Sequence, residues 1–261
     1  MKSQAITAVI LRHLRLLRRE PNRITMVLFW PLINIALFGF FGKWVQLQHE
    51  IPHFHLALLL GVCLWQAINT MAVETGLTLL EELWSHNIIN LFACPLRPAE
   101  WLSGIVSFAS LITVFDLMYY TFIVKLFYGI PMLTFGPYLL LFGASLIFSG
   151  IWIGMLILLL IIKFGKKAGE LAFAVGWCLA PFTSAFYPRE VLPTWAQTVG
   201  SFIPVTHILE SMRSYILHNQ NPIAGIILGI SLSLVYIVIT LKICNYMFIK
   251  TKEKGIIRLL D

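Results

Sequence analysis

The sequence predicts an all-α membrane protein with six transmembrane helices in a single transmembrane domain, and composition is the first observation behind this prediction. Hydrophobic residues make up 59% of the 261 residues and charged residues only 12%, with a mean hydropathy of +0.84. Soluble domains carry about a quarter charged residues, so this chain has more apolar surface than one globular core can bury. The other two observations are the length of its apolar runs and the placement of basic residues between them.

The excess of basic residues points to lipid rather than to nucleic acid. The formal net charge is +7 and the sequence pI is about 9.3. The basic residues are dispersed between apolar runs and form no basic face with interleaved aromatics, so we expect membrane lipids as partners and no nucleic acid. The four cysteines lack the spacing of a metal site and are expected to pack as small apolar residues.

A group of polar residues after the first apolar run raises the alternative of a zinc site. His49, Glu50, His53 and His55 lie close together in the sequence, but Pro52 splits them and no helical spacing fixes them. A solvated loop is the simpler interpretation. We therefore expect no metal and no cofactor on this chain.

The N-terminal segment, residues 1–23, is expected to form an amphipathic helix in the membrane interface. Residues 3–19 alternate at helical spacing, with Ile6 and Val9 on one side and Arg12 on another. A basic amphipathic helix directly ahead of an apolar run is typical of a segment that lies on the membrane surface. A plain solvated helix is the alternative, and the apolar run that follows almost at once disfavours it.

Six apolar runs, each a candidate span at roughly 20 residues, follow this helix. They are Ile24–Gly42, Phe54–Leu80, Trp101–Phe127, Pro137–Ile162, Leu171–Tyr187 and Ile223–Phe248. The first contains Pro31, and the fifth is short and interrupted by Pro181, so a bend or break is expected in each. The domain therefore divides into residues 1–23, 24–80 (spans one and two), 81–98, 99–187 (spans three to five), 188–221 and 222–261 (span six and the tail).

The placement of Lys and Arg gives the orientation, because cytoplasmic segments of membrane proteins are enriched in both. The N-terminal segment, the connection between the fourth and fifth runs and the C-terminal tail carry most of them. The opposite side offers only Lys43, Arg189 and Arg213, with Lys125 near it. We therefore expect both termini in the cytoplasm, and an even number of spans agrees with this.

The segment 81–98 interrupts the apolar runs on the predicted cytoplasmic side. Trp84, Ile88, Leu91 and Phe92 recur at i, i+4, i+7 and i+8, which places them on one apolar stripe of a helix. Such a helix, lying parallel to the membrane, needs an apolar partner. That partner is either lipid or a groove on another protein.

Both ends of this helix have signals in the sequence. Glu81 and Glu82 favour its N-terminal end, because the helix dipole stabilises negative charge there. Pro95 and Pro98 end it, since a proline cannot donate the backbone hydrogen bond that continues a helix. His86 lies between these ends and points away from the apolar stripe.

Residues 188–221, between the fifth and sixth runs, are expected to form short helical pieces on the external side. Pro188, Pro193 and Pro204 divide the segment, which is too short and broken for a full hairpin through the bilayer. Non-helical backbone at membrane depth survives only where it is buried in protein or faces water. This favours a place at a dimer interface around a cavity.

Three polar residues of this segment, His207, Glu210 and Arg213, recur at i, i+3 and i+6 and could form one polar strip. The alternative is an intrahelical ion pair between Glu210 and Arg213 at an external surface. Such a pair would contribute only a few tenths of a kcal/mol. The sequence leaves both interpretations open.

Glu74 and Asp116 are ionisable residues inside predicted spans, where an unpaired charge is costly. Glu74 lies near the cytoplasmic end of its span and could simply be interfacial. Asp116 lies deeper and could line a pathway or bond a neighbouring hydroxyl such as that of Thr113. The aromatic residues Trp65 and Tyr119 could line a conduit as well, although packing is the default role for each.

Together these segments resemble the membrane subunit of an ABC-2 type exporter in its bacterial half-transporter form, and the resemblance covers essentially the whole chain. One stretch that carries it is Glu-Leu-Trp-Ser-His-Asn-Ile-Ile-Asn-Leu-Phe-Ala-Cys-Pro-Leu-Arg-Pro at 82–98. The others are Phe-Tyr-Pro-Arg-Glu-Val-Leu-Pro-Thr-Trp at 186–195 and Ile-Pro-Val-Thr-His-Ile-Leu-Glu-Ser-Met-Arg at 203–213. The order, spacing and predicted sides of these motifs make the combination specific.

The resemblance implies a permease subunit that forms a translocation pathway as a homodimer. Segment 81–98 would be the coupling helix, which docks into a cleft of a separate ATP-hydrolysing subunit present in two copies. Its site residues would be Glu81, Glu82, Trp84, His86, Ile88, Leu91, Phe92, Pro95 and Arg97. The family's external re-entrant pair, which helps to close the exit, would include Tyr187, Pro188, Trp195, Pro204, His207, Glu210 and Arg213. The pathway residues would be Trp65, Asp116 and Tyr119.

The chain has no GxxxxGKS or GxxxxGKT phosphate loop, so ATP and Mg are expected on the partner ATPase and no cofactor on this chain. The family often has Arg or Glu inside the coupling helix, where this chain has Ser85, His86 and Asn87, and partner specificity is therefore open. The resemblance also implies a multi-pass protein of the bacterial cytoplasmic (inner) membrane. It would export a glycan or glycolipid, a lipid or a hydrophobic drug.

Two other classes of protein stay open as alternatives. A membrane-embedded lipid-modifying enzyme would need clustered polar catalytic residues at one interface, and no nucleophile–base arrangement stands out. An ion-driven secondary carrier would show internal repeats with paired broken helices, whereas only the fifth span is clearly broken here. We therefore expect a transport subunit rather than an enzyme.

Overall fold

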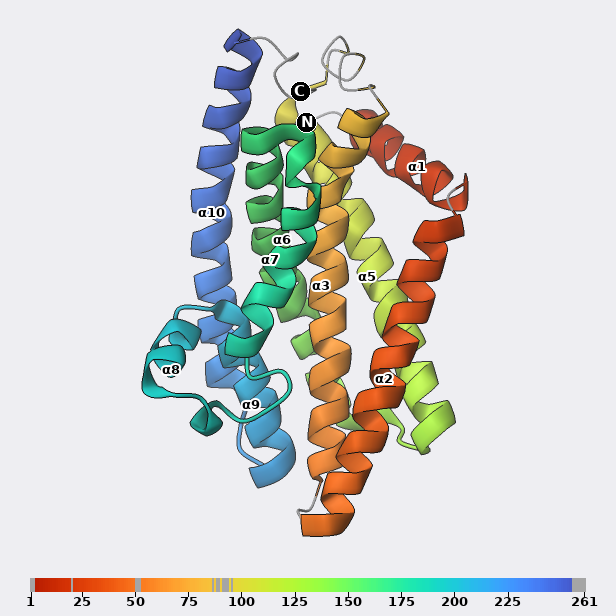
Figure 1. The fold of residues 1–261 in the computed structure, drawn as a ribbon, viewed down its shortest axis with the longest axis vertical. Coiled ribbons are helices and arrows are strands. Elements are labelled where there is room, and N and C mark those ends of the chain that lie inside the picture. The colour runs from red at the N-terminus through yellow and green to blue at the C-terminus, as the bar shows by residue number, and fades with distance from the viewer. Residues whose placement is uncertain are drawn as a thin grey trace.

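The computed structural model of the chain describes residues 3–19, 21–49, 53–85, 87, 90, 94 and 96–254. Within these ranges every regular element is a helix, which confirms the predicted all-α class (Figure 1). Five of the described helices are long and apolar enough to cross a membrane. They are α2 (Pro21–His49), α3 (Phe54–Trp84), α5 (Pro98–Tyr128), α6 (Pro137–Phe164) and α10 (Ile223–Lys254).

The fifth expected span, Leu171–Tyr187, does not form a spanning helix, so the described residues contain five long helices where six were expected. α7 (Gly169–Leu179) has 11 residues and continues only as the 3-10 turn η3 (Ala180–Phe182). At 1.5 Å per residue a helix of that length reaches about 17 Å, roughly half of the hydrocarbon thickness. The physical reason is Pro181, which has no N–H with which to continue the helix.

Shorter elements lie between the long helices in the described part of the chain. They are η1 (Met132–Phe135), η2 (Gly165–Ala168), η4 (Arg189–Val191), α8 (Thr194–Ser201) and α9 (Pro204–His218). In Figure 1, α7 runs beside α6, and α9 lies nearer to the opposite end of the bundle. The two short helices together lead the chain from one end of the bundle to the other, although neither does so alone.

The two ends of the bundle differ in charge. α1 (Ser3–Arg19), the end of α6 and the end of α10 lie at the same end, at the top of Figure 1. We call this the basic end, because it carries Arg15 and Arg18 of α1 together with Lys163 of α6 and Lys250 of α10. The end of α2 and the start of α3 lie at the opposite end. An excess of Lys and Arg is typical of the cytoplasmic side of a membrane protein. The basic end is therefore the predicted cytoplasmic end, and this prediction rests on charge.

α3 is the central helix and is buried on almost every side. It packs against α2, α5, α6, α7 and α9, and its residues 57–68 are all buried. Such a helix is expected to be apolar on most of its surface, as most of the sequence of α3 is. α6 can approach it closely because Gly150 and Gly154 face it. A methyl group on Gly150 would lie 2.5 Å from Met71 Cβ, and one on Gly154 would lie 2.5 Å from Thr75 Cβ.

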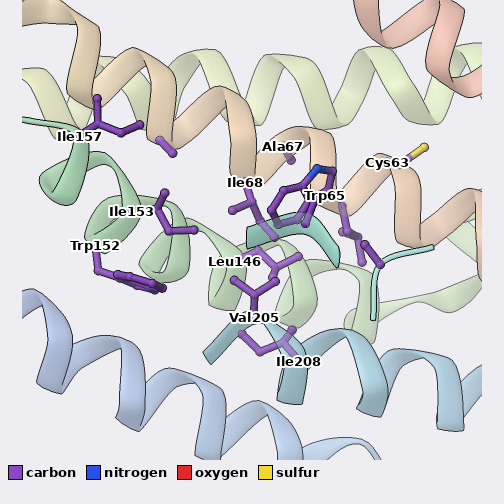
Figure 2. Close-up of a cluster of buried hydrophobic side chains, with 14 of the residues drawn as sticks. Cys63, Trp65, Ala67, Ile68, Leu146, Trp152, Ile153, Ile157, Val205 and Ile208 are labelled. Carbon is purple, nitrogen blue, oxygen red and sulfur yellow. The ribbon is translucent and has the colours of Figure 1, made fainter. Parts of the chain in front are cut away.

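The apolar core where α3, α6 and α9 meet is shown in Figure 2. Trp65 and Ile68 of α3 point toward Leu146 of α6, and Val205 and Ile208 of α9 lie on the other side of Leu146. Each of these five side chains is at most 1% exposed. Apolar packing thus fixes α9 to the central helices, and α9 in turn positions the irregular chain before it.

α1 lies across the basic end, tilted away from the long axes of α2 and α3 (Figure 1). Its buried residues, Val9 and His13, face α5. Val9 fits against Gly104, where a methyl group would lie 2.6 Å from the valine Cβ, and the His13 ring lies 5.5 Å from the Phe108 ring. The expected amphipathic helix is therefore present and packs on α5. Its place in a membrane interface stays a prediction.

Candidate functional site

The start of the expected coupling segment belongs to α3. This helix ends at Trp84, four residues beyond the expected end of the second span at Leu80, so Glu81, Glu82 and Trp84 lie in its last turn. The sequence suggested that Glu81 and Glu82 begin a separate helix. The structure places them at the end of α3 instead. The helix runs on because Leu80 and Leu83 are buried and continue its apolar side.

Glu82 joins three parts of the chain at the basic end. It is 1% exposed, and its Oε2 lies 2.7 Å from Nη2 of Arg12 on α1. The same oxygen accepts a hydrogen bond from Asn87 Nδ2 at 2.6 Å, and the Asn87 N–H donates to the Glu82 carbonyl at 3.0 Å. A buried carboxylate needs a cation and hydrogen-bond donors, and here both are supplied. α1 and the chain after α3 are therefore held by one side chain.

Trp84 is the exposed aromatic residue of this junction. Its side chain is 53% exposed, while its ring also borders the start of α7, where a methyl group on Gly169 would lie 3.4 Å from Cζ2. Arg97 precedes α5, and its N–H donates to Glu100 Oε2 at 3.2 Å, which caps that helix. The other predicted coupling residues, His86, Ile88, Leu91, Phe92 and Pro95, lie outside the described residues, and their apolar stripe stays a prediction.

The second region of interest is residues 180–203, which we call the broken segment. The end of α7 frees backbone carbonyls, and side chains supply donors to them. Tyr187 Oη donates to the Pro181 carbonyl at 2.7 Å and Thr206 Oγ1 to the Phe182 carbonyl at 2.9 Å. Arg213 Nη2 donates to the carbonyl of Ser184 at 2.9 Å. Irregular backbone in a membrane domain must be satisfied in this way.

His207, Glu210 and Arg213 do not act as one polar strip. His207 Nε2 donates to the Ser201 carbonyl at 2.8 Å, whereas Arg213 reaches Ser184. Within the described residues the ion pair of Glu210 is with Arg189, at 3.8 Å, and not with Arg213. The helical spacing is present in α9, but the three side chains hold three different parts of the broken segment.

Burial shifts the pKa values of the charged residues in this region. Burial raises the pKa of Glu210 above its ordinary value, while Arg189 opposes this by favouring the carboxylate. Burial likewise lowers the pKa of Arg213, although a guanidinium stays charged. Burial also raises the pKa of the Tyr187 hydroxyl, which therefore stays a hydrogen-bond donor. The hydrogen bonds of Tyr187 and Arg213 both go to backbone carbonyls, so these side chains support the backbone here.

The remaining residues of the expected external gate lie around the broken segment. Pro188 precedes η4, and Pro204 is the first residue of α9 and is buried. Trp195 at the start of α8 is 63% exposed, and its ring meets that of Phe182 edge to face at 5.9 Å. The region thus combines a supported backbone with an exposed aromatic side chain. A gating role for these residues stays a prediction.

The three expected pathway residues lie in packed surroundings within this chain. Trp65 is in the core of Figure 2, and Tyr119 Oη donates to the Leu28 carbonyl at 3.1 Å. Asp116 is fully buried and accepts a hydrogen bond from Tyr120 Oη at 3.0 Å. Asp116 is thus bonded by hydroxyls of Tyr120 and Thr70, whereas the Thr113 hydroxyl donates to its own helix.

Sequence reasoning missed the Arg12–Glu82 pair and the support of the broken segment. Glu82 carries a weak signal, since it is the last carboxylate of a long apolar run. Nothing local identifies Arg12 as its partner, because 70 residues separate the two. The donors to Phe182 and Ser184 are 24 and 29 residues away from their acceptors, so they too are visible only in three dimensions.

The described residues form a helical bundle with five candidate spans and one broken crossing, which is the architecture of a polytopic membrane protein. Comparisons with known proteins give its family. Residues 4–217 match the family model described as ABC-2 type transporter. A protein of Pyropia yezoensis named as a transport permease, ycf38, is 27% identical over 217 residues, which cover 80% of this chain and 73% of that protein. The chain therefore belongs to the ABC-2 type transporter family of membrane transport permeases, which confirms the resemblance seen in its motifs.

Proposed function

We propose that the chain is the membrane-spanning subunit of an ATP-driven exporter and that two copies enclose the translocation pathway. Two copies of a separate ATPase would bind at the basic end and supply the ATP and Mg. Membership of the family supports the transport role. The observation that carries the coupling role is exposed Trp84 on the last turn of the central helix, beside the junction that Glu82 holds.

The geometry at the basic end suits the transmission of motion. An ATPase that grips the chain around Trp84 would pull on α3, which packs against α2, α5, α6, α7 and α9. α1 would follow, because Arg12 binds Glu82. Packed helices move as rigid bodies between discrete arrangements, so a small displacement here reaches the opposite end. ATP can drive this change only if it binds the two arrangements with different affinity.

The broken segment is the proposed gate on the exit side. Side chains of α9 donate to its carbonyls at Phe182 and Ser184, so the turn that follows α7 is supported where the helix does not continue. In a dimer it would lie near the exit of the pathway. The basic end supports a cytoplasmic place for both termini, in a bacterial cytoplasmic (inner) membrane.

The exported substrate is proposed at the level of chemical class. The compact loops at the predicted external side and the polar residues of α9 favour a glycan or glycolipid, with a lipid or a hydrophobic drug as the next candidates. The adjacent genes would narrow this choice, since an ATPase gene beside sugar-transferase genes would favour the glycan.

The test is to purify the chain with a co-encoded ATPase and to measure ATP-driven transport in proteoliposomes. Trp84→Asp should lower the rate of ATP-driven transport at least about tenfold, because a charge would replace an apolar contact with the ATPase. The variant should still insert and fold. Ser85→Asp is the matched control, since it adds the same charge one residue away and keeps the indole.

Three results would contradict this role. Full transport by the Trp84→Asp variant would show that Trp84 is not part of a coupling site. Transport that needs an ion gradient and no ATPase would indicate a secondary carrier. Modification of a lipid by the chain alone would indicate an enzyme.

A further inference from the structure

A hollow of about 340 Å³ opens at the basic end of the bundle. It lies between the start of α5, the end of α6 and the last third of α10, and its walls include Ala99, Leu102, Leu158 and Ile162. The walls are mainly apolar. Among the described residues, Pro98 at the end of segment 81–98 lines it, whereas Trp84, Arg97 and the residues of the broken segment do not.

Two polar side chains stand on the α10 wall of this hollow. Lys242 and Asn245 are three residues apart, so they share one face of the helix. Both are exposed, and neither forms a hydrogen bond or an ion pair with the described part of the chain. The described residues that line the hollow include no carboxylate. The hollow therefore pairs an apolar interior with a lysine and an amide that have no partner in the described part of the chain.

The depth of Lys242 suggests what the cation meets. It lies six residues before Phe248, where the apolar run of α10 ends, which corresponds to about 9 Å along the helix. A lysine at that depth extends toward the lipid headgroups, and an ammonium group there is costly unless it meets an anion. In a bilayer matched to this apolar run, the phosphates of the nearest leaflet would lie beyond Phe248, in the direction in which the lysine extends.

We propose that the hollow is a binding site for an anionic phospholipid, whose acyl chain fills the apolar interior while its phosphate meets Lys242 and Asn245. A hydrocarbon chain suits these walls because it brings no backbone polar groups, whereas a peptide would bring several that the hollow does not satisfy. A bound lipid would tie α5, α6 and α10 together at the end where the ATPase is expected. The site does not depend on the proposed transport function.

The test uses the full chain in detergent, with its ATPase where the two purify together, titrated with lipids and followed by native mass spectrometry. Wild type should bind one phosphatidylglycerol more tightly than phosphatidylcholine. Lys242→Gln should lower the affinity for phosphatidylglycerol about fivefold and reduce its preference over phosphatidylcholine. One lysine near an anionic headgroup has about that effect. Lys250→Gln is the matched control, because it removes the same charge from the same helix outside the hollow and should leave this affinity unchanged.

A second variant tests the apolar part of the site. Ala99→Trp fills the hollow from the exposed start of α5 and should weaken both lipids at the tight site, with an unchanged melting temperature as the check on folding. Equal effects of Lys242→Gln and Lys250→Gln would overturn the proposal in favour of general charge attraction. Binding of glycerol 3-phosphate as tight as that of phosphatidylglycerol would show a phosphate site without a lipid, and unchanged lipid binding in Ala99→Trp would show that the hollow is not the site.

Discussion

Arg213 illustrates how single residues support the irregular part of this chain. It is 6% exposed and donates to the carbonyl of Ser184, a residue with a positive φ of 58°. Such a backbone conformation is costly for a residue other than glycine and persists only where neighbouring groups hold it. Arg213 thus stabilises the turn that follows α7.

Arg213→Leu should lower the stability of the full chain. It leaves the buried Ser184 carbonyl without its donor, which costs about 1–2 kcal/mol, or about 3–6 °C in Tm for a protein of this size. Thermal unfolding in detergent is the measurement, with Arg15→Leu as the control, because Arg15 is exposed on α1. If the two variants lost the same stability, the supporting role of Arg213 would be wrong.

The sequence predicted which residues of this region matter but not what they do. Tyr187, His207 and Arg213 were all expected at the external gate, and all three donate to backbone carbonyls of the broken segment or its edge. Helical spacing suggested that they would face one another. Their partners depend on where the chain returns after the break at Pro181, which no local pattern encodes.

At the scale of helices, the long apolar runs were predictable and the ends were less so. α3, α6 and α10 begin at the expected residues. Pro137 marks the start of α6, and the onset of apolar sequence at Ile223 marks the start of α10. α3 runs to Trp84 and α10 to Lys254, past the apolar runs, because helical hydrogen bonds continue into polar sequence. The fifth run failed as a span, since proline outweighs hydropathy there.

The tie between α1 and α3 yields a prediction at this scale. Arg12→Gln removes the cation from buried Glu82, and since Arg12 is 37% exposed the loss of stability should be modest, about 1 kcal/mol. The loss of coupling should be larger, because α1 would no longer follow α3. ATP-driven transport with the partner ATPase should fall several-fold, and Arg12→Lys should restore part of it.

Arg15→Gln is the control for this tie, since it removes the same charge from an exposed position of the same helix. If Arg12→Gln and Arg15→Gln transported equally well, the Arg12–Glu82 pair would have no role in coupling. A fall in the amount of folded protein that matched the fall in transport would show that the pair serves stability alone.

For the whole molecule, the central claim is that the basic end faces the cytoplasm and that an ATPase binds there. Family membership makes the chain a transport permease, and the charge of the two ends is the basis of the proposed orientation. Cys94 offers a natural probe, because it is exposed within segment 81–98. The exposed Cys178 can be replaced by alanine, while Cys63 and Cys244 are buried.

The most direct measurement is therefore the labelling of Cys94 with a membrane-impermeant maleimide, in a Cys178→Ala variant, in vesicles of both orientations. Labelling should occur in inside-out vesicles only, and bound ATPase should protect the thiol. Labelling of Cys94 from the external side, or equal labelling with and without the ATPase, would contradict the account.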